Sequence, residues 1–335
     1  MPQMAGRLTA TMNTNITTLC FGKLPQFGDF IRYNAAGAEL KLLDDWLQTG
    51  MAGIRQRLDA SWETQYRQAP AYHFLYAPGG GTGFLVGVLM FSRDKSERKY
   101  PFLISLQMSR QHFDTRYKQL IPIVFGNFLN QADALLPRIQ EVSGSSEIIH
   151  MMQNLSPAID YREALRQYQY YVNRTTVEAF FRQSLGSFSD PRKYLLFKNL
   201  LDGLLPLRSR DLSRVTLGFR FPLGIAPGKE RFSQVCFWLD VAMQVLRHPA
   251  GIFPTLFWSH GRDEAPEYLF LFFSPPPSGA LASLISVDLD ADAIFKLEAD
   301  RLNRMAVARQ ELPQPYASLL DSGAISLNAF LQRLW

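Results

Sequence analysis

Cysteine and long apolar runs are both scarce in this 335-residue chain. Its two cysteines, Cys20 and Cys236, lie far apart, which predicts a reducing compartment and argues against a disulfide framework. Its longest apolar runs are as short as Tyr268–Phe273, whereas a bilayer span needs roughly 18–20 residues. The N-terminus lacks the apolar core of a signal peptide. We therefore expect a cytoplasmic protein without membrane insertion.

Sequence motifs for catalysis or cofactor binding are also missing. There is no Gly-x-Ser-x-Gly elbow for acyl transfer, and no two histidines stand at His-x-x-x-His spacing beside an acid. The glycine-rich run 79–83 lacks the Gly-Lys-Ser/Thr ending of a phosphate loop and precedes a strand-like run instead of a helix. Gly22-Lys23 is followed by Leu24, which does not fit that loop either. We expect no enzyme activity, no cofactor and no metal site.

Several polar residues are interpreted as structural. His73 lies within an apolar run and is expected to be a satisfied core or edge residue. Asp44 and Asp45 begin a helical turn beside Trp46. Asp288, Asp290 and Asp292 flank a predicted helix start, where acids favour the helix dipole.

Positive charge is unevenly distributed along the chain. The net charge is +5, yet residues 161–220 alone hold eleven Lys/Arg and five Asp/Glu. Such a segment either attracts an acidic or phosphorylated partner or forms solvated helix faces, and we favour the second interpretation. The basic residues are spaced singly, without a Lys/Arg run or a nucleic-acid-binding motif, so no nucleic-acid partner is expected.

Apolar periodicity predicts the N-terminal elements. Residues 39–58 are expected to form a helix, because apolar residues recur every three or four positions at Leu40, Leu43, Leu47, Met51, Ile54 and Leu58. Runs rich in aromatic and branched residues predict strands at 72–77, 84–91 and 102–108, with a hairpin loop at 78–83. Their short connections predict an antiparallel meander. Residues 117–140 are expected to form one helix, with Pro122 in its first turns.

The later part of the chain is predicted to be mixed. Residues 145–205 are expected to be helical without a strand. Further strands are predicted at 215–221, 255–258 and 268–273, and further helices at 232–246, 290–309 and 327–334. The last helix ends beside Trp335 and is expected to dock on its own domain. Residues 1–16 are expected to be a disordered leader.

These elements indicate an α+β fold, with an antiparallel β-sheet packed with helices, an additional helical segment and a C-terminal α/β region. We predict an N-terminal domain at 17–142, a helical segment at 143–212 and the C-terminal region at 213–335. The helical segment and the C-terminal region can pack with the N-terminal domain into one body.

The loop at 21–30 is the most informative stretch of the sequence. Pro25 fixes its own φ angle and donates no hydrogen bond, while Gly22 and Gly28 permit positive φ or close backbone approach. Asp29 is placed to accept hydrogen bonds from free N–H groups at the start of the next helix. The loop is therefore either a rigid connection or a platform that presents Lys23 and Asp29 to a partner.

Five motifs in order make the region 18–110 similar to TagF, also called ImpM-like, a type VI secretion-associated family of Gram-negative bacteria. They are Gly22-Lys23-Leu24-Pro25-x-x-Gly28-Asp29-Phe30, Asp45-Trp46-Leu47-Gln48-x-Gly50, Ala69-Pro70, Gly87-Val88-Leu89-Met90-x-Ser92-x-Asp94 and Arg98-Lys99-Tyr100-Pro101-Phe102. Two positions depart from the pattern: Phe91 replaces an expected proline, and Glu97 replaces an expected small residue.

The resemblance implies a non-enzymatic, post-translational repressor of type VI secretion. In that family the protein is understood to bind and sequester a forkhead-associated scaffold, in a pathway with a Ser/Thr kinase and phosphatase. The candidate partner-binding or motif residues are Lys23, Pro25, Gly28, Asp29, Arg32, Trp46, Asp94 and Arg98. Two alternatives remain: a structural or assembly component of the secretion apparatus, and an enzyme of unrecognised type, which a deep polar pocket with convergent titratable groups would favour.

Overall fold

A single nine-stranded sheet runs through the computed structural model, which describes residues 16–57, 62–224, 228, 230–247, 251–259, 266–286 and 292–334. The strand order is β2-β1-β5-β4-β3-β7-β8-β6-β9. All neighbours pair antiparallel except β6 and β9, which are parallel. The strands are β1 Ile16–Gly22, β2 Ile31–Tyr33, β3 Tyr72–Tyr76, β4 Gly83–Met90, β5 Phe102–Ser109, β6 Gly218–Leu223, β7 Thr255–Ser259, β8 Glu267–Phe272 and β9 Ile294–Lys296.

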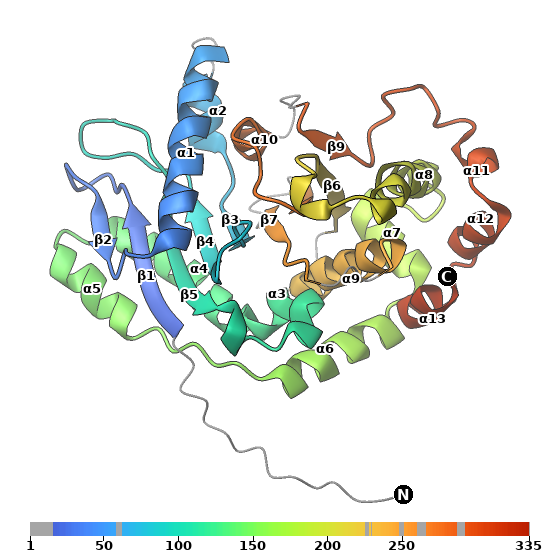
Figure 1. Cartoon of the computed structure of the whole chain (residues 1–335), viewed down its shortest axis with the longest axis horizontal. Helices are drawn as coiled ribbons and strands as arrows, with labels where there is room; N and C mark the ends of the chain where they lie inside the picture. The colour runs from blue at the N-terminus through green and yellow to red at the C-terminus, as the bar shows by residue number, and fades with distance from the viewer. Residues whose placement is uncertain are drawn as a thin grey trace, which may run out of the picture.

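Helices cover both faces of this sheet, as Figure 1 shows for α1 and α10 on one side and α6 and α9 on the other. The first layer contains α1 Ala38–Arg57, α2 Trp62–Gln68 and α10 Ala280–Ile285. The second contains α3 Ile121–Val124, α4 Gly126–Glu141, α5 Ser145–Gln153, α6 Tyr161–Arg174, α7 Val177–Leu185, α8 Arg192–Leu204, α9 Glu230–Val245, α12 Gln314–Asp321 and α13 Leu327–Arg333. A short helix, α11 Ala308–Glu311, packs on α8. The predicted α+β class is confirmed.

The N-terminal elements form where the sequence pattern places them. The apolar stripe of α1 is buried from Leu40 to Ile54, while Leu58 lies outside the described residues. Strands β3, β4 and β5 form the predicted antiparallel meander, with the hairpin at 78–82 joining the first two. Every residue of β4 is buried, because alternate side chains face the two helical layers. That double burial explains why β4 reads as a continuous apolar run.

The predicted helix at 117–140 is wrong as a single element. The chain forms a 3₁₀ helix at Thr115–Leu120, then α3 and α4. Phe125 separates the two α-helices with φ −97° and ψ 5°, which lies outside helical geometry. Pro122 lies in the first turn of α3, as expected, and a second proline, Pro137, lies inside α4.

The C-terminal prediction needs a larger correction. The helix predicted at 290–309 is replaced, within its described part, by β9, turns and the start of α11. Strand β6 begins at Gly218 instead of 215, and α2, α10 and α12 were not predicted. The α13 helix docks on its own protein through Leu327, Phe330 and Leu331, as expected. Four sequence-based expectations concern residues outside the described part of the chain. These residues are 1–15 of the predicted leader, Asp288, Asp290 and Trp335.

The two halves of the chain meet within the sheet. Strand β3 pairs with β7, so Tyr72 lies opposite Ser259 and Leu75 opposite Leu256. The predicted division into three segments stays a prediction, but strands from the first and third segments share one hydrogen-bonded ladder. Across the described helices, none is long and apolar enough to cross a membrane.

Both cysteines are free and buried. Burial raises the pKa of the Cys20 thiol to about 12. At neutral pH that thiol is protonated, so its role is packing within the core.

Candidate functional site

A buried carboxylate, Asp94, lies at the centre of the family-like motifs. Its side chain is fully buried, and Oδ2 accepts hydrogen bonds from Lys23 Nζ at 2.9 Å and from Arg98 Nε at 2.6 Å. Lys23 is itself only 8% exposed. One carboxylate therefore serves two cations, one of them buried. We call these three residues the Lys23–Asp94–Arg98 cluster.

Backbone hydrogen bonds lock the cluster in place. Asp94 Oδ1 accepts from the backbone N–H groups of Ser96 and Arg98, both at 2.9 Å, which closes the 94–98 turn. Arg98 Nη2 donates to the Gly28 carbonyl at 2.6 Å and so ties this turn to the 22–30 loop. Burial by itself would raise the pKa of the Asp94 carboxyl, but the hydrogen bonds from Lys23 and Arg98 outweigh it and hold that pKa well below its ordinary value. The carboxylate is therefore charged throughout the physiological range.

Gly22 is the residue that lets the first and last motifs meet. Its φ of +134° is one that L side chains rarely adopt, and a Cβ atom there would lie 2.1 Å from the Pro101 carbonyl oxygen. The sequence-based expectation for Gly22 is confirmed. Gly28 does not share this property, because its φ is not positive and a Cβ atom there would meet nothing within 4 Å.

The expected role of Asp29 is wrong. The loop leads into strand β2 instead of a helix, and Asp29 is exposed. Across the described part of the chain, no N–H group donates to its carboxylate. The sequence pattern alone did not show that a strand intervenes before α1.

The other predicted site residues fall into two groups. Arg32 and Arg98 are exposed, as expected for some of these charges, and Pro25 is exposed too. The expectation that the loop presents Lys23 at the surface is corrected: Lys23 is buried, because its ion pair with Asp94 keeps it inside the protein. Trp46 is a core residue: it stacks on Phe257 at 5.3 Å, and its Nε1 donates to the Pro277 carbonyl at 3.1 Å.

An open cleft of about 520 Å³ lies beside the cluster. Aromatic rings and charged side chains line it, and the lining comprises Lys23, Phe30, Gln48, Arg55, Trp62, Glu63, Glu97, Arg98, Lys99 and Tyr100. The hydroxyl of Tyr100 donates to Asp44, which fixes the ring at the cleft. Arg55, Trp62 and Tyr100 were not identified as site residues from the sequence. Tyr100 stands in a motif, whereas Arg55 and Trp62 carry no signal of their own.

Glu97 lies in this site with a left-handed backbone, at φ +63°. This geometry explains why a small residue is expected there. Glu97→Gly should raise the free energy of unfolding by up to about 1 kcal/mol, because relief of the left-handed backbone exceeds the loss of the exposed ion pair with Arg93. Lys95→Gly, in the same turn but without positive φ, should lower it, since glycine there only adds freedom to the unfolded chain. Urea denaturation of both variants tests this, and a loss of stability in both would contradict it.

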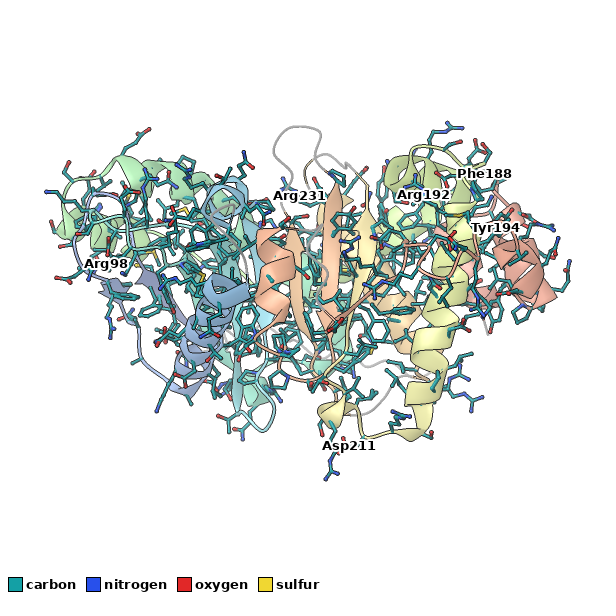
Figure 2. All side chains as sticks on the ribbon, turned by 90° about the horizontal axis from the view of Figure 1, so that it is seen from above. Arg98, Phe188, Arg192, Tyr194, Asp211 and Arg231 are labelled. Carbon is teal, nitrogen blue, oxygen red and sulfur yellow. The ribbon has the colours of Figure 1, made fainter. Side chains whose placement is uncertain are left out.

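The basic segment 161–220 forms a separate region. Figure 2 places Arg98 on one side of the molecule and Arg192 on the opposite side of the central strands. All five acids of the segment pair with its own cations, and the pairs are Arg166–Glu163, Arg182–Glu178, Arg192–Asp190, Lys198–Asp202 and Arg214–Asp211. Much of its charge is thus neutralised locally, which agrees with the interpretation as helix surfaces.

His73 is a core residue, as expected. It is fully buried against the rings of Phe232 and Trp258, and its Nε2 pairs with Asp133 Oδ2 at 2.7 Å. Within the described residues, no group of three His, Cys, Asp or Glu side chains is arranged to hold a metal ion.

Comparison with known proteins finds a similarity in the N-terminal region. Residues 20–155 match the family described as "TagF N-terminal domain, Type VI secretion system-associated". The crystal structure of PA0076 from Pseudomonas aeruginosa PAO1 aligns with 82% of this chain and 96% of its own, at 16% identity and a TM-score of 0.49. Among curated proteins, none matches this sequence significantly.

Proposed function

We propose that this protein is a non-enzymatic repressor of a type VI secretion system, because residues 20–155 match the family described as the TagF N-terminal domain, type VI secretion system-associated. It acts after translation, by binding a forkhead-associated scaffold protein and withholding it from the assembling machine. The Ser/Thr kinase and phosphatase pathway associated with the family is a further candidate partner.

The observation that supports a binding role is the rigid presentation of Arg98. Its side chain is 59% exposed, yet two hydrogen bonds hold its guanidinium in place. Nε donates to the Asp94 carboxylate, and Nη2 donates to the Gly28 carbonyl. An exposed guanidinium that is already immobilised loses little conformational entropy when a partner binds. Arg32 is exposed as well and lies over the rings of Phe21 and Phe30, at 5.3 and 5.6 Å from their centroids.

The proposal is tested first by measuring secreted effector in the culture medium. Deleting the gene should raise secretion, and excess protein should lower it, because the scaffold is occupied stoichiometrically. A structural component of the apparatus would behave in the opposite way, with secretion lost on deletion. An enzyme would show turnover of a phosphoester or nucleotide that is lost when one residue of the cleft is changed.

The binding surface is tested by a pull-down of the scaffold with Arg32→Glu. This exposed charge is chosen over Lys23, which is buried, and over Arg98, which supports Asp94. The variant should melt like the parent and bind several-fold more weakly, mainly through slower association. Equal binding by a normally melting variant would place the partner surface away from Arg32.

A further inference from the structure

A second cleft adjoins the one beside the cluster. It has a volume of about 320 Å³ and is lined by Pro25, Tyr66, Arg67, Phe91, Ser92, Arg93, Lys99 and Gln140. Lys99 lines both clefts, and so does helix α2, through Trp62 and Glu63 on one side and Tyr66 and Arg67 on the other. The two clefts therefore form one continuous surface across α2, which we call the double cleft.

The double cleft carries an excess of positive charge. Two carboxylates, Glu63 and Glu97, line it, against six cations: Lys23, Arg55, Arg67, Arg93, Arg98 and Lys99. Even when the carboxylates behind the lining, Asp94 and Asp44, are included, the cations outnumber the acids. This balance favours an acidic ligand.

The excess charge is concentrated on guanidinium groups without acidic partners. Glu63 is paired with Lys99 at 3.0 Å and Glu97 with Arg93 at 3.0 Å, so both lining carboxylates are already engaged. Among the described residues, neither Arg55 nor Arg67 pairs with a carboxylate. Arg55 and Arg67 are therefore the groups that an incoming carboxylate would neutralise.

Trp62 supplies an apolar surface between these charges. Its ring is only partly buried and contacts Tyr66 edge-on at 5.9 Å. The Arg55 guanidinium and the Lys99 ammonium lie 5.7 and 5.2 Å from the ring centroid. Tryptophan and arginine are the residues most enriched at the energetic centres of protein interfaces. This arrangement suits a ligand that combines carboxylates with an apolar side chain.

We propose that the double cleft binds an extended acidic peptide segment of a partner protein. Carboxylates of the segment pair with Arg55, Arg67 and Arg98, and an apolar side chain packs on Trp62. The inference rests on the proposed function in one respect, that the site binds a protein, and it adds the chemistry of the segment that is bound.

The test uses the full-length protein and a fluorescein-labelled dodecapeptide of alternating Glu and Ala with one central Leu. Fluorescence anisotropy should show binding that weakens as salt is raised, because ion pairs at a surface are screened. A peptide with Lys in place of Glu should not bind. A dT12 oligonucleotide should bind more weakly than the acidic peptide. Tighter binding of the oligonucleotide would overturn the proposal in favour of a nucleic-acid site.

Variants then locate the binding site. Arg55→Glu combined with Arg67→Glu should weaken peptide binding at least tenfold, and Trp62→Ala should weaken it at least threefold. Arg210→Glu is the matched control: it is exposed, it adjoins Asp211, which Figure 2 places far from Arg98, and it should change affinity less than twofold. Melting curves identify any variant that fails to fold. An equal loss with folded Arg210→Glu, or no binding by the parent, would overturn the proposal.

The secretion assay separates this inference from the proposed function. If the parent fails to bind the acidic peptide but deletion still raises secretion, the repressor function survives and the double cleft is not its acidic-peptide site. If the peptide binds as described but deletion leaves secretion unchanged, the acidic-peptide site is supported and the proposed repressor function is contradicted.

Discussion

Replacing Asp94 with asparagine should lower the free energy of unfolding by about 3–5 kcal/mol, the cost of removing one partner from a buried ion pair. The substitution leaves Lys23 buried without its anion, and Arg98 loses the carboxylate that holds its Nε. Urea denaturation monitored by tryptophan fluorescence measures the loss. Asp45→Asn removes an exposed carboxylate from helix α1 and should change stability by no more than about 0.5 kcal/mol.

The pH dependence of stability gives a second readout of the same carboxylate. The folded-state pKa of Asp94 is depressed below the ordinary value of about 3.9, so its stabilising effect is fully present above about pH 4. It is lost as pH falls from there through the folded-state pKa. The parent should therefore lose stability more steeply than Asp94→Asn below pH 4. Parallel curves for the two proteins would contradict the assigned role, as would a loss no larger than that of Asp45→Asn.

Gly22→Ala should lower the free energy of unfolding by about 3–5 kcal/mol, because a strained backbone and an overpacked contact add together. The methyl group would lie 2.1 Å from the Pro101 carbonyl oxygen and 2.6 Å from Phe102 Cα, and both are backbone atoms of the adjoining β5 region. Neither can move without disturbing the β1–β5 ladder, where Gly22 pairs with Phe102. Urea denaturation at neutral pH measures the change.

Gly28→Ala is the matched control for that experiment. Gly28 lies in the same loop and the same motif, but it is exposed, its φ is not positive, and its surroundings are open. The alanine variant should be within about 0.5 kcal/mol of the parent. Equal losses at the two positions would show that the loop responds to any added side chain, and the argument from the Pro101 contact would fail.

The contrast between Gly22 and Gly28 shows where sequence reasoning succeeds and where it stops. The motif identifies both glycines, but close approach depends on β5, some 80 residues later in the chain. Local patterns predict α1 and the β3–β5 meander, because periodicity and short loops are local properties. The Lys23–Asp94 pair joins residues 71 positions apart, and no spacing rule reports such a contact.

Errors concentrate where tertiary contacts override local preference. Residues 294–296 enter the sheet as β9 because they pair with β6, although the surrounding sequence favours a helix. Phe125 leaves helical geometry between α3 and α4, where its ring packs against Phe84 and Phe113. The double cleft is assembled from α1, α2, α4 and the turns after β1 and β4, so its residues are scattered in the sequence and were only partly identified.

The pairing of β3 with β7 also sets the order of events during translation. The partners Leu75 and Leu256 are separated by about 180 residues, so β3 leaves the ribosome long before its neighbour exists. At elongation rates of about 5–20 residues per second, the interval is roughly 10–40 seconds. Throughout it, the growing chain carries an apolar strand edge that pairs readily with other nascent chains. The sheet order therefore leaves the β3 edge without its β7 partner until most of the chain has been synthesised.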